Sequence, residues 1–468
     1  MIMTNTKNKN SCAMTAVVTL FMNIFLVVNL SYADCRPDIL LLFFLNGALF
    51  YAFTLRALFK HPYSLELMFW IFMFYFMFFA PLVQYTRHDF PWGRLNDTEV
   101  WSANVILFLF SLCFIIGTSL YKAKKREIKR NDGFFISEPI ESSTSFSTVL
   151  LMISGFIFLL ALRRKGVSGL FVGRNENVGL YEGANSSISM LVTSISIAFL
   201  TFATAYAFSL AKKQRGLQRY VLPFLQFACL LLSYFPTSIA RYSVACIYIG
   251  LILIVVNRFE RGSSFYWFFT VALVFLFPLM NLFRYQNLFE ADISKFLAGF
   301  SKRFFSSYTD GHYDAFAMLG QTVQYVKRNG FSYGHQLLGS VLFFVPRTFW
   351  PNKPIGSGAT IMETLRKDFT NVSCPLMGEA YINFGYAGVI VFALLVGYWV
   401  SRLDTNYWQA QEECENCGSV YLFLLSLFFF MLRGDLLSSW AYTMGFVAVA
   451  FVLRVAYRHF DISNLRSE

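Results

Sequence analysis

The sequence has few charged residues for its length. Among 468 residues only 14% are Asp, Glu, Lys or Arg, whereas about a quarter of an ordinary soluble domain is charged. Hydrophobic residues make up 56% and aromatic residues 19%. This balance excludes an ordinary soluble enzyme and predicts a polytopic membrane protein.

Several patterns that would indicate other functions are also missing. The eight cysteines form no dense framework, and the single Cys414-x-x-Cys417 pair has neither a second pair nor a nearby His, so we expect no zinc site. The net charge is +12, but the basic clusters adjoin apolar stretches, where topology and anionic lipids explain them. No zinc finger, RNP-like or recognition-helix pattern occurs, and we expect no nucleic-acid partner. A disulfide between Cys35 and Cys374 is left open.

Apolar stretches long enough to cross a bilayer as helices recur along the whole chain. The sequence predicts an all-α polytopic membrane protein with about twelve transmembrane helices. We place them at about residues 13–31, 38–58, 65–85, 100–120, 146–162, 188–211, 220–236, 238–257, 265–283, 378–400, 419–432 and 438–456.

The basic loops fall on one side of this arrangement if both termini are inside. The first apolar run followed by Ser31-Tyr32-Ala33 also matches a cleavable signal peptide, although its length favours a retained helix. The predicted organisation is helices 1–4 in residues 1–120, a cytoplasmic linker at 121–145, helices 5–9 in 146–283 with an outer loop at 163–187, a large outer loop at 284–377, and helices 10–12 with a cytoplasmic tail in 378–468.

The large outer loop carries helical patterns of its own. Apolar residues from Ile293 to Phe304 recur at helical spacing, which predicts a helix lying in the membrane interface. A second helix is expected over 313–327. Residues 335–345 are apolar over a stretch too short to cross, so we expect them to dip into the membrane and return.

Basic residues collect at the outer ends of the predicted helices and in the outer loops. They are Arg174, Arg241, Arg284, Arg347, Lys353 and Arg433. Guanidinium groups bind phosphate oxygens in a bidentate fork, so converging arginines would hold a diphosphate. The alternative is that each side chain reaches lipid phosphates separately.

The outer acid–base candidates are Asp310, His335 and Glu379, with His312 and Asp314 beside the first. Asp310 and Asp314 are expected to share one helix face. Glu379 would open the tenth span at the membrane edge, where a partly desolvated carboxylate suits a general base. It would equally suit a carboxylate that complements a helix N-terminus. No obligatory metal or other cofactor is expected.

Two segments resemble a known family. FFVPRTFWPNKP at 343–354 and GEAYINFGYAG at 378–388 are similar to segments of the Wzy-type polymerases of O-antigen and related oligosaccharide repeat units. Looser agreement comes from Arg174 in a Gly-rich loop, ARYS at Arg241, FRYQ at Arg284 and LRGD at Arg433, so the resemblance extends over about 165–440.

The resemblance implies a glycosyltransferase of the bacterial inner membrane whose large loop and active site face the periplasm. Its donor and acceptor would both be oligosaccharides linked to undecaprenyl diphosphate, and a Wzz-type chain-length co-polymerase would be its partner. The six basic residues would hold the leaving diphosphate without a metal, and Glu379, or else His335 or Asp310, would take the acceptor proton. Arg347 and Gly358 fit a family spacing of Arg followed by ten residues and Gly, but Arg174 has no Gly at that spacing.

Two other functions remain open at this point. An O-antigen ligase would share the donor and the large outer loop, although the 343–354 and 378–388 segments favour the polymerase. A flippase or exporter of lipid-linked oligosaccharide would need polar residues through the membrane depth, whereas these charges collect at the outer edge.

Overall fold

The computed structural model describes residues 6–125, 136–169, 186–256, 259, 262–276, 305–365, 369–413 and 418–465. Within these ranges the regular elements are helices, and extended backbone pairs only at an isolated bridge between Pro139 and Ser419. The all-α prediction is therefore confirmed for the described part of the chain.

Eight of the described helical segments are long and apolar enough to cross a membrane. They are α1 (Thr6–Val28), α2 (Pro37–Lys60), the run from α3 (Leu65–Phe74) through the π-turn Tyr75–Phe79 to α4 (Ala80–Thr86), α5 (Asp97–Lys125), α6 (Thr144–Gly169), α8 (Ser186–Lys213), α17 (Leu376–Glu413) and α19 (Leu436–Leu465). These eight coincide with eight of the predicted spans and support a polytopic membrane protein.

The remaining predicted spans correspond to shorter apolar helices. They are α9 (Val221–Ser233), α10 (Arg241–Val255), α11 (Ser264–Val271) and α18 (Val420–Arg433). Each is shorter than the roughly 20 residues that a straight crossing of the hydrocarbon core needs. The total of twelve spans therefore stays a prediction.

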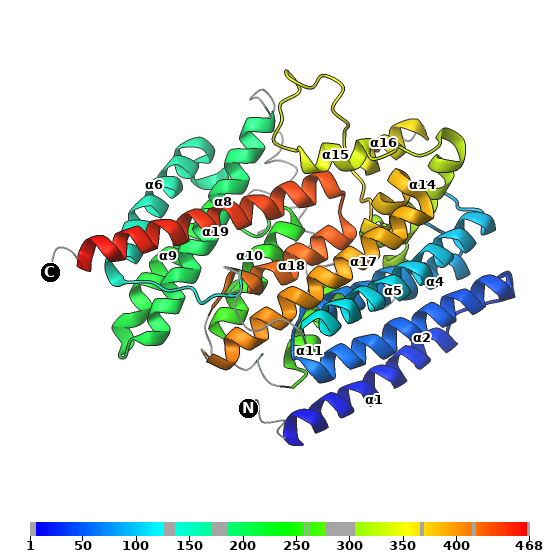
Figure 1. Ribbon diagram of the computed structural model, residues 1–468, viewed down its shortest axis with the longest axis horizontal. Helices are drawn as coiled ribbons and strands as arrows, with labels where there is room; N and C mark the ends of the chain where they lie inside the picture. Colours follow the sequence, from blue (N-terminus) through cyan, green and yellow to red (C-terminus); the bar gives the residue numbers. More distant parts are fainter. Residues whose placement is uncertain are drawn as a thin grey trace.

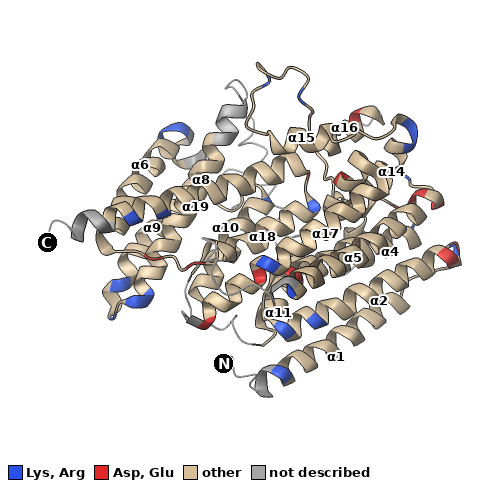
Figure 2. Cartoon of the chain, viewed as in Figure 1, with Lys and Arg blue, Asp and Glu red and all other residues tan. Residues whose placement is uncertain are grey.

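The long helices pack into one bundle (Figure 1), and the run from α3 to α4 is the most buried of the eight candidate spans. Every residue of α3 from Leu65 to Phe74 is buried, which its almost uninterrupted apolar sequence explains. Charged residues gather near helix ends and connections and leave long stretches of helix uncharged (Figure 2). This is the distribution expected of helices whose middles lie in hydrocarbon.

Helices α5 and α17 pack along each other with their backbones close together. A Cβ at Gly117 would lie 2.3 Å from the carbonyl oxygen of Leu394, and one at Gly397 would lie 2.3 Å from that of Phe114. Small residues permit such approach between membrane helices. This close packing anchors the long part of α17 against α5.

The large loop contributes three described α-helices at one end of the bundle. They are α14 (Ala315–Asn329), α15 (His335–Val341) and α16 (Ser357–Thr364). Helix α14 confirms the helix predicted over 313–327. Helix α15 ends before Pro346, and the predicted return through the membrane stays untested; the interfacial helix predicted from Ile293 to Phe304 lies outside the described residues. Cys35 and Cys374 are both free, so they form no disulfide.

Candidate active site

A break in α17 separates its first two turns from the long apolar part. Phe384 and Gly385 leave helical geometry, with φ of Gly385 at +60°, a backbone conformation that glycine adopts without strain. The side chain of Asn383 helps to fix the break, because its Oδ1 accepts hydrogen bonds from Ser332 Oγ at 2.9 Å and from the Leu337 N–H at 3.2 Å. These bonds hold the first two turns, which carry Glu379, against the segment from Ser332 to Leu337 at the beginning of α15.

Glu379 is fully buried, with no exposed surface. Its Oε2 accepts a hydrogen bond from Ser357 Oγ at 2.7 Å, and its Oε1 accepts one from the Leu436 N–H at 3.0 Å. These donors come from the first residues of α16 and α19. The two helix N-termini offer unpaired N–H groups and a positive dipole end, which favour a carboxylate. The prediction that Glu379 lies at a partly desolvated edge understates its burial.

A second carboxylate, that of Asp435, adjoins Glu379 between α18 and α19. Its Oδ2 accepts from the Gly358 N–H and its Oδ1 from the Leu437 N–H, both at 3.0 Å. Unlike Glu379 it is only partly buried. Burial raises the pKa of Asp435 above its usual value, although the backbone N–H donors oppose that shift. Glu379 and Asp435 are called the carboxylate pair below.

Arginine side chains from two other elements converge on the segment just before α14. Nη2 of Arg433, at the end of α18, donates to Asp314 Oδ1 at 3.0 Å and to the Gly311 carbonyl oxygen at 3.1 Å. Nη2 of Arg241, at the beginning of α10, lies 3.1 Å from His312 Nδ1. The structure thus brings together two of the predicted diphosphate ligands, and we call Arg241, His312, Asp314 and Arg433 the arginine cluster.

Asp314 is the most heavily engaged member of the arginine cluster. It is 2% exposed, and besides Arg433 it accepts hydrogen bonds from Ser373 Oγ at 2.8 Å and from Trp92 Nε1 at 3.0 Å. It is therefore a positioning group for Arg433 rather than an accessible base.

The arginine cluster and the carboxylate pair are joined through short stretches of chain. Arg433 and Asp435 are separated by one residue, and Ser373, which contacts Asp314, has its carbonyl oxygen 2.9 Å from the position that a Cβ on Gly358 would occupy. The two groups therefore lie on neighbouring segments at the α14–α16 end of the bundle, and together we call them the polar centre. It combines guanidinium donors suited to phosphate oxygens with carboxylates suited to proton transfer.

The predicted relationship between Asp310 and Asp314 is wrong. A 3-10 turn at Gly311–Tyr313 lies between the two residues, with Asp310 before the turn and Asp314 after it as the N-cap of α14. Asp310 is exposed, whereas Asp314 is buried. Partial desolvation and the nearby Asp89 carboxylate raise the pKa of Asp310, but the described contacts do not bring it into the polar centre.

The remaining described candidates lie in or beside the loop between α15 and α16. His335 is exposed at the beginning of α15, with its ring 6.0 Å from that of Trp350. Arg347 donates to the carbonyl oxygens of Lys353 and Pro354. Lys353 Nζ donates to the carbonyl oxygens of Phe343 and Val345 at 2.6 Å and 3.0 Å. Both cations therefore bond the backbone of their own loop, and their predicted role toward a diphosphate stays a prediction.

Two predicted ligands, Arg174 and Arg284, lie outside the described residues. Among the residues that the structure does describe, no group of three or more His, Cys, Asp or Glu side chains is arranged to hold a metal ion. The Cys414-x-x-Cys417 pair also falls outside that part of the chain.

A comparison with protein families adds an independent finding. Residues 364–458 match the family model described as O-antigen polysaccharide polymerase Wzy. The predicted resemblance to the Wzy-type polymerases is confirmed. The Wzy match covers about a fifth of the chain and includes Glu379, Arg433 and Asp435. No curated protein and no solved structure matches the chain.

Together with the eight candidate spans, the Wzy match supports an integral membrane protein of the O-antigen polymerase type. Sequence reasoning overlooked Asp435, Ser357 and Ser373 in this region. Asp435 had a readable signal, because an Asp directly before an apolar helix is a common N-cap. The two serines had none, since their contacts depend on how distant segments fold together.

Proposed function

We propose that the chain polymerises O-antigen by joining oligosaccharide repeat units linked to undecaprenyl diphosphate, at the periplasmic face of the bacterial inner membrane. The observation that carries the proposal is the position of the Wzy match. The matched residues include Glu379, Asp435 and Arg433 of the polar centre.

Arg241 and Arg433 would bind the diphosphate of the donor. Both already contact the 311–314 segment, so a phosphate between them would meet guanidinium groups whose positions are set beforehand. Guanidinium groups stay charged at any relevant pH and stabilise the charge that develops on a leaving diphosphate. Arg174, Arg284, Arg347 and Lys353 are proposed as further ligands on the resemblance alone.

Asp435 is the proposed general base. It is partly exposed while Glu379 is sealed, so an acceptor hydroxyl can approach Asp435 but not Glu379. The hydroxyl oxygen would attack the anomeric carbon of the donor sugar and pass its proton to Asp435. The bond from that carbon to the diphosphate would break, and its electron pair would leave with undecaprenyl diphosphate. Glu379 would hold Asp435 and the α19 N-terminus in place.

The test is a lipopolysaccharide gel from a strain lacking this gene. Complementation with wild type should restore a ladder of repeat units. Complementation with Asp435→Asn should leave lipid A core carrying a single repeat, with polymerisation reduced about a hundredfold or more. Asp34→Asn, which changes an exposed carboxylate far from the polar centre in sequence, is the matched control and should restore the full ladder.

The same gel separates the other functions. A deletion strain with bare core and no attached repeat would overturn the polymerase and indicate a ligase or an exporter. A full ladder with Asp435→Asn would leave the polymerase standing and remove Asp435 as its base. In a strain that also lacks a Wzz-type protein, complementation with the wild-type gene should give a ladder of altered length if that protein is the partner.

A further inference from the structure

A second polar site lies at the other end of α19, about 28 Å along the helix from Asp435 at 1.5 Å per residue. A cavity of about 430 Å³ opens there between α8, α18, α19 and the extended segment 136–142. Its walls include Phe202 and Tyr206 of α8 and Tyr457 of α19. Nothing in the proposed polymerase reaction uses this cavity.

The extended segment is fixed across the helix ends by backbone hydrogen bonds. The Ile140 N–H donates to the Gly418 carbonyl oxygen at 2.6 Å, and the Tyr421 N–H donates to the Ile136 carbonyl oxygen at 3.0 Å. These bonds place Glu138 and Glu141 at the rim of the cavity. The rim is thus a built feature of the fold.

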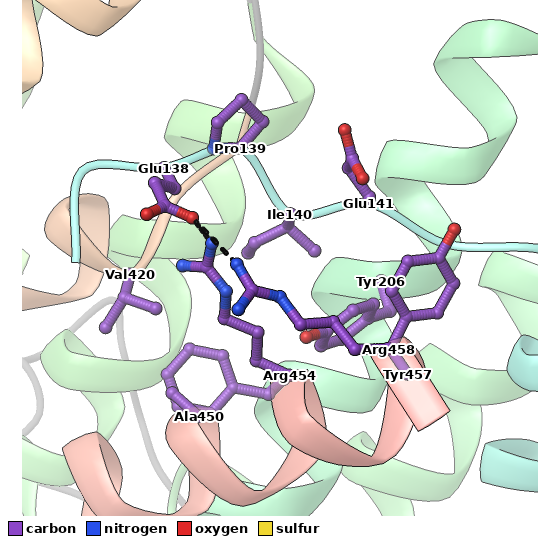
Figure 3. Close-up of a pocket in the computed structure, with 11 residues that line it drawn as sticks. Glu138, Pro139, Ile140, Glu141, Tyr206, Val420, Ala450, Arg454, Tyr457 and Arg458 are labelled. Carbon is purple, nitrogen blue, oxygen red and sulfur yellow. Dashed lines mark ion pairs between the residues drawn. The ribbon is translucent and has the colours of Figure 1, made fainter. Parts of the chain in front are cut away.

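Charge is divided across the cavity. Arg454 and Arg458, four residues apart on one face of α19, both pair with Glu138 Oε2, the second at 3.6 Å. Glu141 stands on the far side of Ile140 from this arginine pair (Figure 3). In the described part of the chain its carboxylate has no hydrogen-bond or ion-pair partner. The guanidinium group of Arg458 has five N–H donors, and its side chain is 65% exposed.

We propose that this cavity binds the headgroup of a zwitterionic phospholipid that carries a phosphate and a primary ammonium. Arg454 and Arg458 match the phosphate, and Glu141 matches the ammonium, which has three donors and needs an acceptor. The neighbouring α19 residues Phe451, Val452 and Val455 are 53%, 62% and 37% exposed, an apolar strip on which acyl chains can lie.

The position of the cavity favours a lipid over a soluble ligand. It lies at the beginning of α18 and near the end of the apolar span of α19, and the ends of apolar helices are where headgroups meet a membrane protein. An anionic lipid fits less well, because the four charged lining residues comprise two acids and two bases. The bound headgroup would tie the 136–142 segment to α19.

The test uses the full-length protein purified in detergent and measures its thermal unfolding while lipid is added. Phosphatidylethanolamine should stabilise wild type more than phosphatidylglycerol, phosphatidylcholine or inorganic phosphate does. Arg458→Gln and Glu141→Gln should each weaken the apparent affinity for phosphatidylethanolamine about tenfold, the loss expected for one charge-assisted hydrogen bond. The Arg458 side chain is 65% exposed, so its replacement should leave the fold intact.

Arg215→Gln is the matched control, because Arg215 is an exposed arginine outside the cavity. It should respond to phosphatidylethanolamine as wild type does. The proposal is overturned if Arg458→Gln and Glu141→Gln keep the wild-type response. It is also overturned if phosphatidylglycerol or inorganic phosphate stabilises wild type as strongly as phosphatidylethanolamine does, since neither carries an ammonium for Glu141.

Discussion

Arg433 and Arg347 were predicted to do the same work, yet they lie in different surroundings. Arg433 pairs with a buried carboxylate from a distant segment, whereas Arg347 is exposed and bonds carbonyl oxygens six and seven residues along its own loop. The first contact depends on the tertiary fold, and the second is local. An arginine predicted at an outer edge can therefore join distant segments or hold the backbone of its own loop, and its position in the sequence alone does not distinguish these two roles.

The largest effect on stability is expected from Arg433→Gln. The change leaves Asp314 buried without its cation, and removal of one partner from a buried pair costs on the order of 3 kcal/mol. Trp92 and Ser373 still donate to Asp314 in the variant, so we expect the loss of stability to be no larger than this. Thermal or denaturant unfolding of the purified protein measures it.

Asp314→Asn in the same chain provides the internal control for Arg433→Gln. The double variant should recover part of the lost stability, because a neutral amide no longer needs the cation. If Arg433→Gln is as stable as wild type, the contrast between the two arginines fails.

Gly356→Ala tests how closely α16 approaches the carboxylate pair. An added Cβ would lie 2.5 Å from Asp435 Oδ2, and the carboxylate is held by two backbone N–H groups. Displacing it should cost about 2 kcal/mol, typical of an overpacked site, and should lower polymerisation in parallel. Gly155→Ala is the control, since nothing lies within 4 Å of the added Cβ; it should be neutral or slightly stabilising.

The apolar pattern of the chain predicted most of the fold and only part of the site. All eight long spans and α14 were readable, because burial in lipid and in a helix core imposes long apolar runs and helical periodicity. Glu379 and Arg433 were also found, since a charge beside an apolar span is conspicuous. The Ser357–Glu379 and Ser373–Asp314 contacts were not predicted, because each joins residues more than twenty positions apart. Serine is a frequent residue, and neither of these two serines belongs to a recognisable sequence motif.

The pH dependence of protein stability should distinguish Asp435, in the polar centre, from the exposed residues of the loop between α15 and α16. Burial raises its folded-state pKa, so the folded protein holds this proton more tightly than the unfolded chain does. The stability that this proton contributes is complete below the unfolded value of about 4 and is lost as pH rises through the folded value. Unfolding midpoints in that acid window should therefore fall more steeply with pH for wild type than for Asp435→Asn. Equal slopes would show that Asp435 titrates as an ordinary exposed carboxyl.

The smallest effect on stability is expected from Arg347→Gln. Its guanidinium group is exposed, and the hydrogen bonds that it donates stay within the loop, so its loss should cost less than about 1 kcal/mol. Lys353→Gln is the companion variant, because the same loop holds its ammonium group on other carbonyl oxygens.

The lipopolysaccharide gel then separates a role of Arg347 in diphosphate binding from a role in holding its loop. If Arg347→Gln unfolds like wild type but leaves a single-repeat band, Arg347 acts on the diphosphate as the resemblance implies. If it unfolds like wild type and also restores the full ladder, the loop bonds are its whole contribution, and the diphosphate depends on the other proposed ligands.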